Sequence, residues 1–152
     1  RISGSSVVID TLALHDRADL LAFQAMRIST EQACRQAGML PSDADFFELC
    51  DSFSIYAPLA LEAAGFAPRG EGWKLAENDG LSLSGKLPIL TMGGGKARGY
   101  PLGAAGLYQV VEAVLQLRGQ AGPNQVKNAR RALVQSLGGA AATVVTHVLE
   151  AM

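Results

Sequence analysis

The sequence predicts an α/β fold in which a mixed sheet carries helices on both faces, and three observations support this prediction. Apolar, β-branched segments alternate with segments of helical periodicity along the 152 residues, as is typical of layered α/β domains. Residues 143–149 form a continuous β-branched run, as expected of a central strand. Apolar residues make up 49% of the chain and charged residues only 18%, which favours one domain with a large core and argues against disorder.

The first third of the chain is expected to contain two strands and a helix. Residues 6–14 are rich in β-branched side chains and predict an extended strand or arm. Apolar residues recur with helical spacing over residues 20–38, and Gly38 followed by Pro41 marks the end of that helix. Residues 46–50 then predict a short buried strand.

The middle of the chain predicts a second helix over residues 55–64, closed by Gly65. Residues 67–87 are polar and carry several glycines and prolines, so they are expected to form a long surface segment. Residues 87–91 predict a strand that leads into the glycine-rich segment at 92–107.

The last third predicts one further helix and two strands. From Leu107 onward, apolar residues occur at i, i+3, i+4, i+7 and i+8, the most regular amphipathic stripe in the chain. The members of this stripe are Leu107, Val110, Val111, Val114 and Leu115. Residues 132–136 and 143–149 read as strands, separated by a turn of small residues at 137–142.

Charge and cysteine content exclude several classes of function. The net charge of −1 provides no field that would attract nucleic acid or an anionic membrane. No apolar run approaches the ~18 residues of a membrane-spanning helix. The two cysteines, Cys34 and Cys50, fit neither a disulfide framework nor a metal site. We therefore expect no metal and a cytoplasmic location, with Cys34 in the core and Cys50 either buried or reactive.

Six glycines fall within fourteen residues of the glycine-rich segment at 92–107. Such density indicates backbone with positive φ or a close approach by another group. Lys96 does not complete a phosphate-binding Gly-x-x-x-x-Gly-Lys-Ser/Thr frame, and no dinucleotide-binding Gly-x-Gly-x-x-Gly unit is present. Close packing of a strand-to-helix turn remains the purely structural interpretation.

Residues 99–106, Gly-Tyr-Pro-Leu-Gly-Ala-Ala-Gly, resemble the Gly-His-Pro-x-Gly-Ala-x-Gly signature of thiolases. Three other segments are similar, in the same order, to segments of sterol-carrier-protein-type and archaeal thiolases. Residues 47–53 resemble Glu-x-His-Asp-x-Phe, residues 61–66 resemble Leu-Glu-x-Leu-Gly-Phe, and residues 116–122 match Gln-Leu-Arg-Gly-x-Ala-Gly.

The resemblance implies that residues 1–152 form the C-terminal half of a thiolase fold, three of its five α-β-α-β-α layers, with residues 1–19 as a connecting arm. It implies coenzyme A thioester substrates, no covalently bound cofactor, and a homodimer formed through an N-terminal half. That half carries the family's nucleophilic cysteine, so these 152 residues alone are expected to be inactive. The resemblance assigns substrate binding to Gly99, Pro101, Gly103, Gly138 and Gly139.

Three positions depart from the family pattern. Tyr100 replaces the histidine of Gly-His-Pro, Cys50 replaces the histidine before Asp51, and Ser52 replaces a second cysteine. Tyrosine, with a pKa of ~10, is a poor base at pH 7, although its hydroxyl can donate a hydrogen bond. The candidate catalytic residues are thus Tyr100, Cys50, Asp51 and Ser52, and ordinary thiolysis is not expected. Asp51 could equally serve as a hydrogen-bond acceptor that orders a loop.

Three functions stay open at this point. The chain could belong to an acyltransferase or lipid-transfer-type protein with altered acid/base residues. It could belong to a thiolase-like aldolase that cleaves a β-hydroxyacyl-CoA beside a zinc-ribbon/OB-fold partner, with Tyr100 as proton carrier. It could also belong to a non-catalytic subunit that binds acyl-CoA. Lys96 and Arg98 either meet coenzyme A phosphates or lie on the surface.

Overall fold

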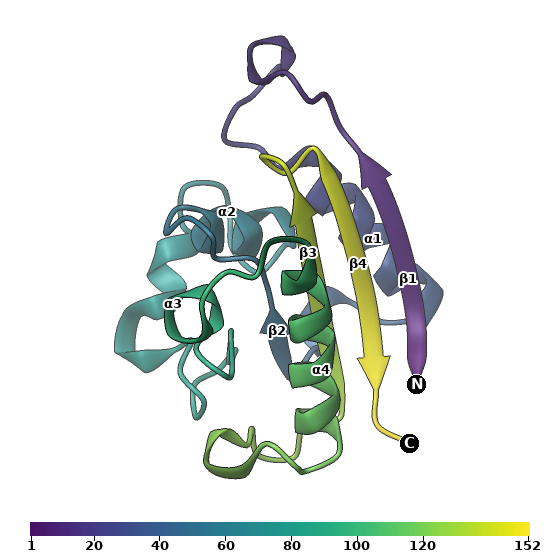
Figure 1. Cartoon of the computed structure of the whole chain (residues 1–152), viewed down its shortest axis with the longest axis vertical. Helices are drawn as coiled ribbons and strands as arrows, with labels where there is room; N and C mark the ends of the chain where they lie inside the picture. The colour runs from purple at the N-terminus through teal and green to yellow at the C-terminus, as the bar shows by residue number, and fades with distance from the viewer.

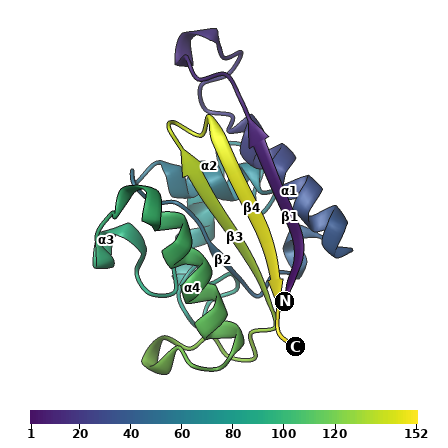
Figure 2. The same cartoon turned by 45° about the vertical axis from the view of Figure 1, so that its right-hand side comes forward.

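The computed structural model describes residues 1–152 and confirms the α/β prediction, with a four-stranded mixed sheet between two layers of helices (Figure 1). The strands lie in the order β1-β4-β3-β2; β1 pairs with β4 and β4 with β3 in antiparallel fashion, whereas β2 and β3 are parallel. The strands are β1 (Ile2–Ile9), β2 (Phe46–Glu48), β3 (Arg131–Gly138) and β4 (Thr143–Glu150). Figure 2 shows β1 at one edge of the sheet.

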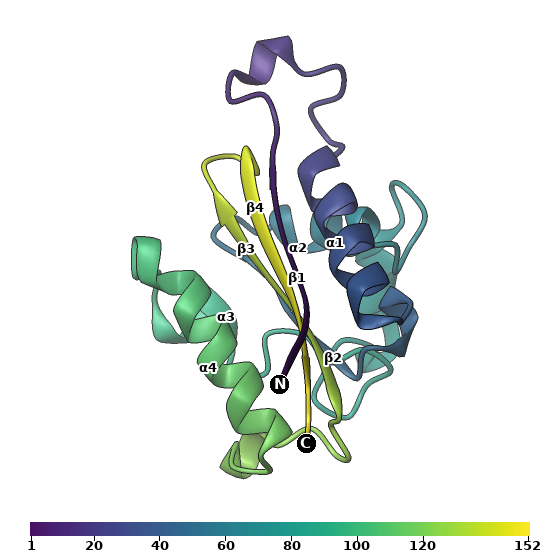
Figure 3. The ribbon, with the colours of Figure 1, turned by 90° about the vertical axis from the view of Figure 1, so that its right-hand side faces the viewer.

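Helices α1 (Gln24–Ala37) and α2 (Tyr56–Ala63) lie on one side of the sheet, and α4 (Ala105–Leu117) lies on the other (Figure 3). A one-turn helix, α3 (Gly94–Arg98), precedes α4. Short 3-10 helices span Leu14–Asp16, Pro41–Asp43, Gly72–Asp79, Leu102–Ala104 and Gly122–Asn124. None of the helices combines the length and apolarity that crossing a bilayer requires.

The two faces of the sheet bury unequal cores. Eighteen buried apolar residues, among them Met26, Phe47 and Val148, form the cluster on the α1 side, whereas the cluster beneath α4 contains seven, including Phe46 and Ala113. Since buried apolar area provides most of the driving force for folding, α1 is the main support of the sheet. The α4 side is the thinner layer.

Several predicted elements keep their place but change their bounds. β1 ends at Ile9, the partner of Thr143, because β4 begins there and offers no partner to later residues. The first helix begins only at Gln24, but it ends as predicted at Gly38, which adopts the left-handed conformation with φ 66°. The second helix lies within one residue of its predicted bounds.

Residues 87–91 do not form the predicted strand. They make a single parallel bridge, between Ile89 and Phe47. Pro88 has no N–H to donate to a ladder, and Leu90 adopts a positive φ of 49°, which turns the chain away from the sheet. The segment therefore adds one bridge beside β2 and then leaves the sheet instead of extending it.

The predicted apolar stripe of α4 is only partly turned toward the sheet. The buried residues of this helix are Gln109, Glu112, Ala113 and Gln116, whereas Leu107 is 69% and Val111 56% exposed; Val110 is half-buried against the smaller core cluster. The buried polar side chains have partners: Gln109 donates to the carbonyl of Leu49, and Gln116 accepts a hydrogen bond from the amide of Val126 at 2.7 Å. Hydrogen bonds thus help to orient the helix, and Leu107 and Val111 are left at the surface.

A chain restricted to these 152 residues is therefore expected to self-associate, because Leu107 and Val111 expose apolar area that gains about 25 cal/mol per Å² on leaving water. Light scattering should report a mass above that of the monomer, rising with concentration. The Leu107→Ser/Val111→Ser double variant should be monomeric, whereas Leu40→Ser, which removes an equally exposed leucine after α1, should behave like the parent. A parent chain that stays monomeric at high concentration would contradict this expectation.

Candidate functional site

The glycine-rich segment is anchored to the residues that follow β2. Asp51 Oδ1 accepts a hydrogen bond from the Gly95 amide at 2.8 Å. A Cβ at Gly94 would lie 2.5 Å from Asp51 Oδ2, and this residue has a φ of +59°, so only glycine fits there. Asp51 thus makes the loop-ordering contact that was one of its two expected roles; its catalytic role stays a prediction.

Tyr100 lies between the end of α3 and the 3-10 helix that leads into α4, and 47% of the residue is exposed. Gly99 on one side has a φ of 86°, and Pro101 on the other is exposed. Gly103 is exposed as well. Three of the five predicted substrate-binding residues therefore lie within three positions of Tyr100 on an exposed turn.

Cys50 is buried, and its Sγ lies 3.5 Å from Ser52 Oγ. These two substituted positions therefore contact each other, although such a thiol–hydroxyl contact is weak.

The other cysteine, Cys34, lies in the core, as predicted. Burial, with a smaller effect of the Asp43 charge, raises the pKa of its thiol to about 11, so Cys34 is unreactive at neutral pH.

Tyr56 is a site residue that the sequence did not reveal. It is the first residue of α2, and its ring meets those of Phe23 and Phe53 edge-on, with centroids 5.2 Å apart in each case. Burial raises the pKa of Tyr56, the charges of Cys50 and Tyr100 act in the same direction, and that of Arg17 opposes them. Tyr56 therefore shares an electrostatic environment with Cys50, Tyr100 and Arg17. An aromatic residue after a polar turn carries no sequence signal for such a role.

Arg17 connects the N-terminal arm to the turn between β3 and β4. Its Nε donates to the carbonyl of Thr11 at 2.8 Å and its Nη1 to the carbonyl of Ala140 at 2.6 Å. The same turn contains Gly138 and Gly139, the other two predicted substrate-binding residues, and both are exposed. The five predicted residues thus lie on two separate loops.

A shallow pocket of about 220 Å³ lies beside the start of α4. Gly103 and Gly106 line one side of it, and Ser136 and His147 line the sheet side. A Cβ at Gly106 would approach Ser136 Oγ to 2.5 Å, so glycine permits α4 to lie this close to β3. Burial lowers the pKa of His147, and its Nδ1 is buried without a hydrogen-bond partner.

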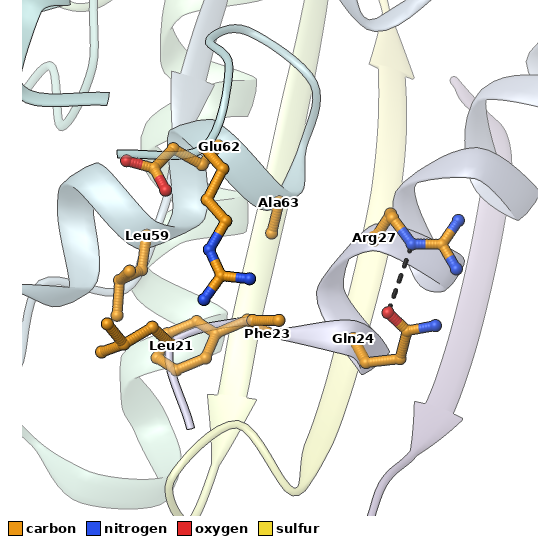
Figure 4. A pocket seen from close by; sticks show the side chains of 9 residues that line it. Leu21, Phe23, Gln24, Arg27, Leu59, Glu62 and Ala63 are labelled. Carbon is orange, nitrogen blue, oxygen red and sulfur yellow. Dashed lines mark hydrogen bonds between the residues drawn. The ribbon is translucent and has the colours of Figure 1, made fainter. Parts of the chain in front are cut away.

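A second pocket, of about 170 Å³, lies between the start of α1 and α2 (Figure 4). Phe23 and Leu59 contribute to its apolar wall. The charged groups at its rim already have partners: Arg27 pairs with Glu31, Arg69 pairs with Asp19, and Glu62 accepts the amide of Gly72. Phe23 separates this pocket from the candidate site, since its ring contacts Tyr56.

Glu48 is fully buried at the end of β2, beneath the glycine-rich segment. Its Oε1 accepts two hydrogen bonds from Thr91, one from the amide at 2.9 Å and one from the hydroxyl at 2.6 Å. Burial raises the pKa of Glu48 from 4.5 to about 7, the bonds from Thr91 oppose this shift, and the charge of Glu112 adds to it. The sequence signal was a carboxylate inside an otherwise apolar strand.

This raised pKa predicts a pH-dependent stability. The folded chain binds the Glu48 proton more tightly than the unfolded chain, so the free energy of unfolding should fall as pH rises from about 4.5 to about 7 and then level off. The expected loss is about 3 kcal/mol, since each pKa unit corresponds to about 1.4 kcal/mol. Denaturant unfolding over this pH range should show a smaller loss in Glu48→Gln, while Glu31→Gln, an exposed carboxylate on α1, should follow the parent. Identical pH profiles for the parent and Glu48→Gln would contradict the prediction.

Comparison with known proteins places these features in a family. Residues 6–151 match the model of the thiolase C-terminal domain-like family. An acetyl-CoA acetyltransferase from Methanothermobacter thermautotrophicus is 39% identical over 147 residues, which cover 97% of this chain and 38% of the relative. Sterol carrier protein 2 from Bos taurus is also 39% identical, over 84% of this chain and 23% of the relative. The chain thus spans well under half the length of these relatives.

Two solved structures share the fold. The Ltp2-ChsH2(DUF35) aldolase superposes with a TM-score of 0.89 and 27% sequence identity. The superposition covers 99% of this chain and 39% of the aldolase chain. A monomeric SCP2-thiolase-like protein from Mycobacterium smegmatis superposes with a TM-score of 0.71 and 23% identity, over 99% of this chain and 29% of its own. The family match spans nearly all of the residues that form the sheet, the glycine-rich segment and the β3–β4 turn. This chain therefore belongs to the thiolase C-terminal domain-like family.

Proposed function

We propose that this chain is the C-terminal half of a thiolase-like enzyme that breaks or forms carbon–carbon bonds in acyl-CoA thioesters, with Tyr100 as its proton carrier. The observation that carries the proposal is the position of Tyr100. It occupies the place of the family histidine on an open, glycine-bounded turn, and its charge contributes to the raised pKa of Tyr56 at the start of α2.

Of the reactions open to such a site, retro-aldol cleavage of a β-hydroxyacyl-CoA suits these residues best. A base removes the proton of the β-hydroxyl, the Cα–Cβ bond breaks, and a carbonyl compound leaves. The electron pair of the broken bond forms the enolate of the remaining acyl-CoA, which is then protonated at Cα. This sequence needs a proton carrier and donors for the enolate oxygen but no cysteine nucleophile.

The similarity to an aldolase over nearly the whole chain supports this choice. That enzyme's name pairs it with a DUF35 protein, so we expect a zinc-ribbon/OB-fold partner for the protein that contains this chain, together with a homodimer formed through its N-terminal half. Acyl transfer is the second candidate, and the 39% identity to an acetyl-CoA acetyltransferase favours it.

The test uses the complete protein with its N-terminal half, supplied with a 3-hydroxyacyl-CoA or with a 3-oxoacyl-CoA plus free coenzyme A. Release of an aldehyde or ketone from the first substrate is the expected result. Thiolysis of the second substrate alone would replace the aldolase by the acyltransferase. Calorimetric binding without turnover would leave an acyl-CoA-binding subunit, and failure to bind either thioester would overturn the proposal.

A further inference from the structure

Two buried carboxyl groups hold the part of the glycine-rich segment that contains α3. Just before the segment, Glu48 on β2 accepts both hydrogen bonds of Thr91. Within the segment, Arg98, the last residue of α3, pairs with Glu112 on α4, with Nη1 3.2 Å from Oε1. The side chains of Arg98 and Glu112 are only 15% and 7% exposed. Tyr100 follows two residues after Arg98.

The two carboxyl groups lie within hydrogen-bonding reach of each other, because a side-chain hydrogen bond from Glu48 lowers the pKa of Glu112 against the effect of burial, and the charge of Glu112 in turn raises the pKa of Glu48. Glu48 Oε2 is buried and accepts no hydrogen bond from any donor of the chain. An unpartnered buried carboxylate oxygen carries a desolvation cost of about 1–3 kcal/mol or more. A proton held between the two carboxyl groups removes this cost, because one group then donates to the other.

The charges around Glu48 and Glu112 favour one shared proton on this pair of carboxyl groups. Arg98 offers a single positive charge to the pair, and Asp51, after β2, adds a negative charge that acts on Glu112. Two carboxylates at close range do not both ionise readily in a buried site. One negative charge balances Arg98, and the second carboxyl stays protonated below about pH 7, the raised pKa of Glu48.

We propose that Glu48 and Glu112 share one proton and, through Thr91 and Arg98, act as positioning residues that hold α3 and set Tyr100 for reaction. The role of Tyr100 rests on the proposed function, but the proton-dependent docking of α3 does not. When the shared proton leaves at alkaline pH, the second carboxylate has no cation to balance it. The hold on Thr91 and Arg98 then weakens, and α3 opens more often.

Hydrogen–deuterium exchange on the complete protein tests the docking directly. The amides of Gly95, Ala97 and Gly99 are all hydrogen-bonded, to Asp51, Gly93 and Gly95 respectively. After correction for intrinsic exchange, the protection of these amides should fall about tenfold or more between about pH 6 and about pH 8.5. A tenfold change corresponds to about one pKa unit of difference, over this pH range, in proton binding between docked and open α3. In Glu48→Gln, whose amide replaces the shared proton by a permanent donor, protection should stay constant.

Matched variants separate this role from general destabilisation. Glu112→Gln leaves Arg98 without its counterion, so the same amides should lose protection at both pH values. Glu31→Gln makes the same chemical change in the exposed pair with Arg27, and it should leave them unchanged. Should Glu112→Gln fail to fold, Glu48→Gln still decides, since it retains the Arg98–Glu112 pair.

The proposal is overturned if Glu48→Gln shows the same loss of protection at alkaline pH as the parent, or if a folded Glu112→Gln protects these amides as well as the parent does. Turnover of a 3-hydroxyacyl-CoA adds a second readout: kcat of the parent should fall on the alkaline side, and kcat of Glu48→Gln should not, with KM unchanged. Absence of turnover together with the expected exchange pattern would refute the proposed function alone.

Discussion

Replacing Tyr100 by phenylalanine in the complete protein is expected to lower kcat for retro-aldol cleavage by about 10²- to 10⁴-fold, the usual contribution of a positioned acid or base. The change removes one hydroxyl and preserves the ring, so the turn between Gly99 and Pro101 should keep its shape. Because the hydroxyl acts mainly in the transition state, KM for the thioester should change little. Steady-state kinetics with a 3-hydroxyacyl-CoA provides the measurement.

Tyr108→Phe is the matched control. Tyr108 lies on α4 and is 48% exposed, almost the same as Tyr100, and its ring lies under the guanidinium of Arg98 at 5.6 Å. The phenylalanine ring preserves that contact, so this variant should retain the activity of the parent. Equal kcat values for Tyr100→Phe and the parent would remove Tyr100 from the mechanism.

Gly4→Ala is expected to destabilise the fold by about 3 kcal/mol, at the upper end of what overpacking costs. A Cβ at Gly4 would lie 2.0 Å from the carbonyl oxygen of Ala33 and 2.9 Å from its carbon, both backbone atoms of α1. The helix cannot move away freely, because Ser29 Oγ on its buried face donates to Ser6 O and lies 2.6 Å from Thr146 Oγ1. The melting temperature should fall by roughly 6–12 °C, given about 2–4 °C per kcal/mol for a domain of this size.

Ser5→Ala provides the comparison for this prediction. Ser5 is adjacent to Gly4 and exposed. Its hydrogen bond to Gln36 uses the backbone amide and not the side chain, so the change to alanine preserves it. A change in stability within about 0.5 kcal/mol is expected for such a surface position. If calorimetry gives Gly4→Ala the melting temperature of Ser5→Ala, the close packing of β1 on α1 is not the constraint inferred here.

The elements predicted well are those whose signals are local. Gly38 ends α1 because a left-handed residue satisfies the last turn of a helix whatever surrounds it. The β3–β4 hairpin follows from a short strand-like run and a β-branched run on either side of a small-residue turn. The prediction of a strand over residues 87–91 was wrong because apolar residues occur both in strands and in buried coil. The positive φ of Leu90 has no signal in the sequence.

The candidate site divides in the same way. The positions of Tyr100, Asp51 and the loop glycines followed from motif resemblance, whereas Tyr56 and Arg17 were found only from their surroundings. Their contacts join residues that are far apart in the chain, which no single-sequence pattern reveals. The partnership of Glu48 with Glu112 is of the same kind, since it spans β2 and α4.

By itself, the sequence determined the α/β class, most helix ends and the resemblance of the glycine-rich segment to thiolases. Periodicity, capping glycines and motifs depend only on residues that are close together in the chain. Only the tertiary structure decided which residues of α4 are buried and that the carboxyl groups of Glu48 and Glu112 interact. The physical reason is that a buried polar group is tolerated only where partners from other elements satisfy it. On α4, Gln109, Glu112 and Gln116 find such partners, and Leu107 and Val111 of the apolar stripe therefore lie at the surface.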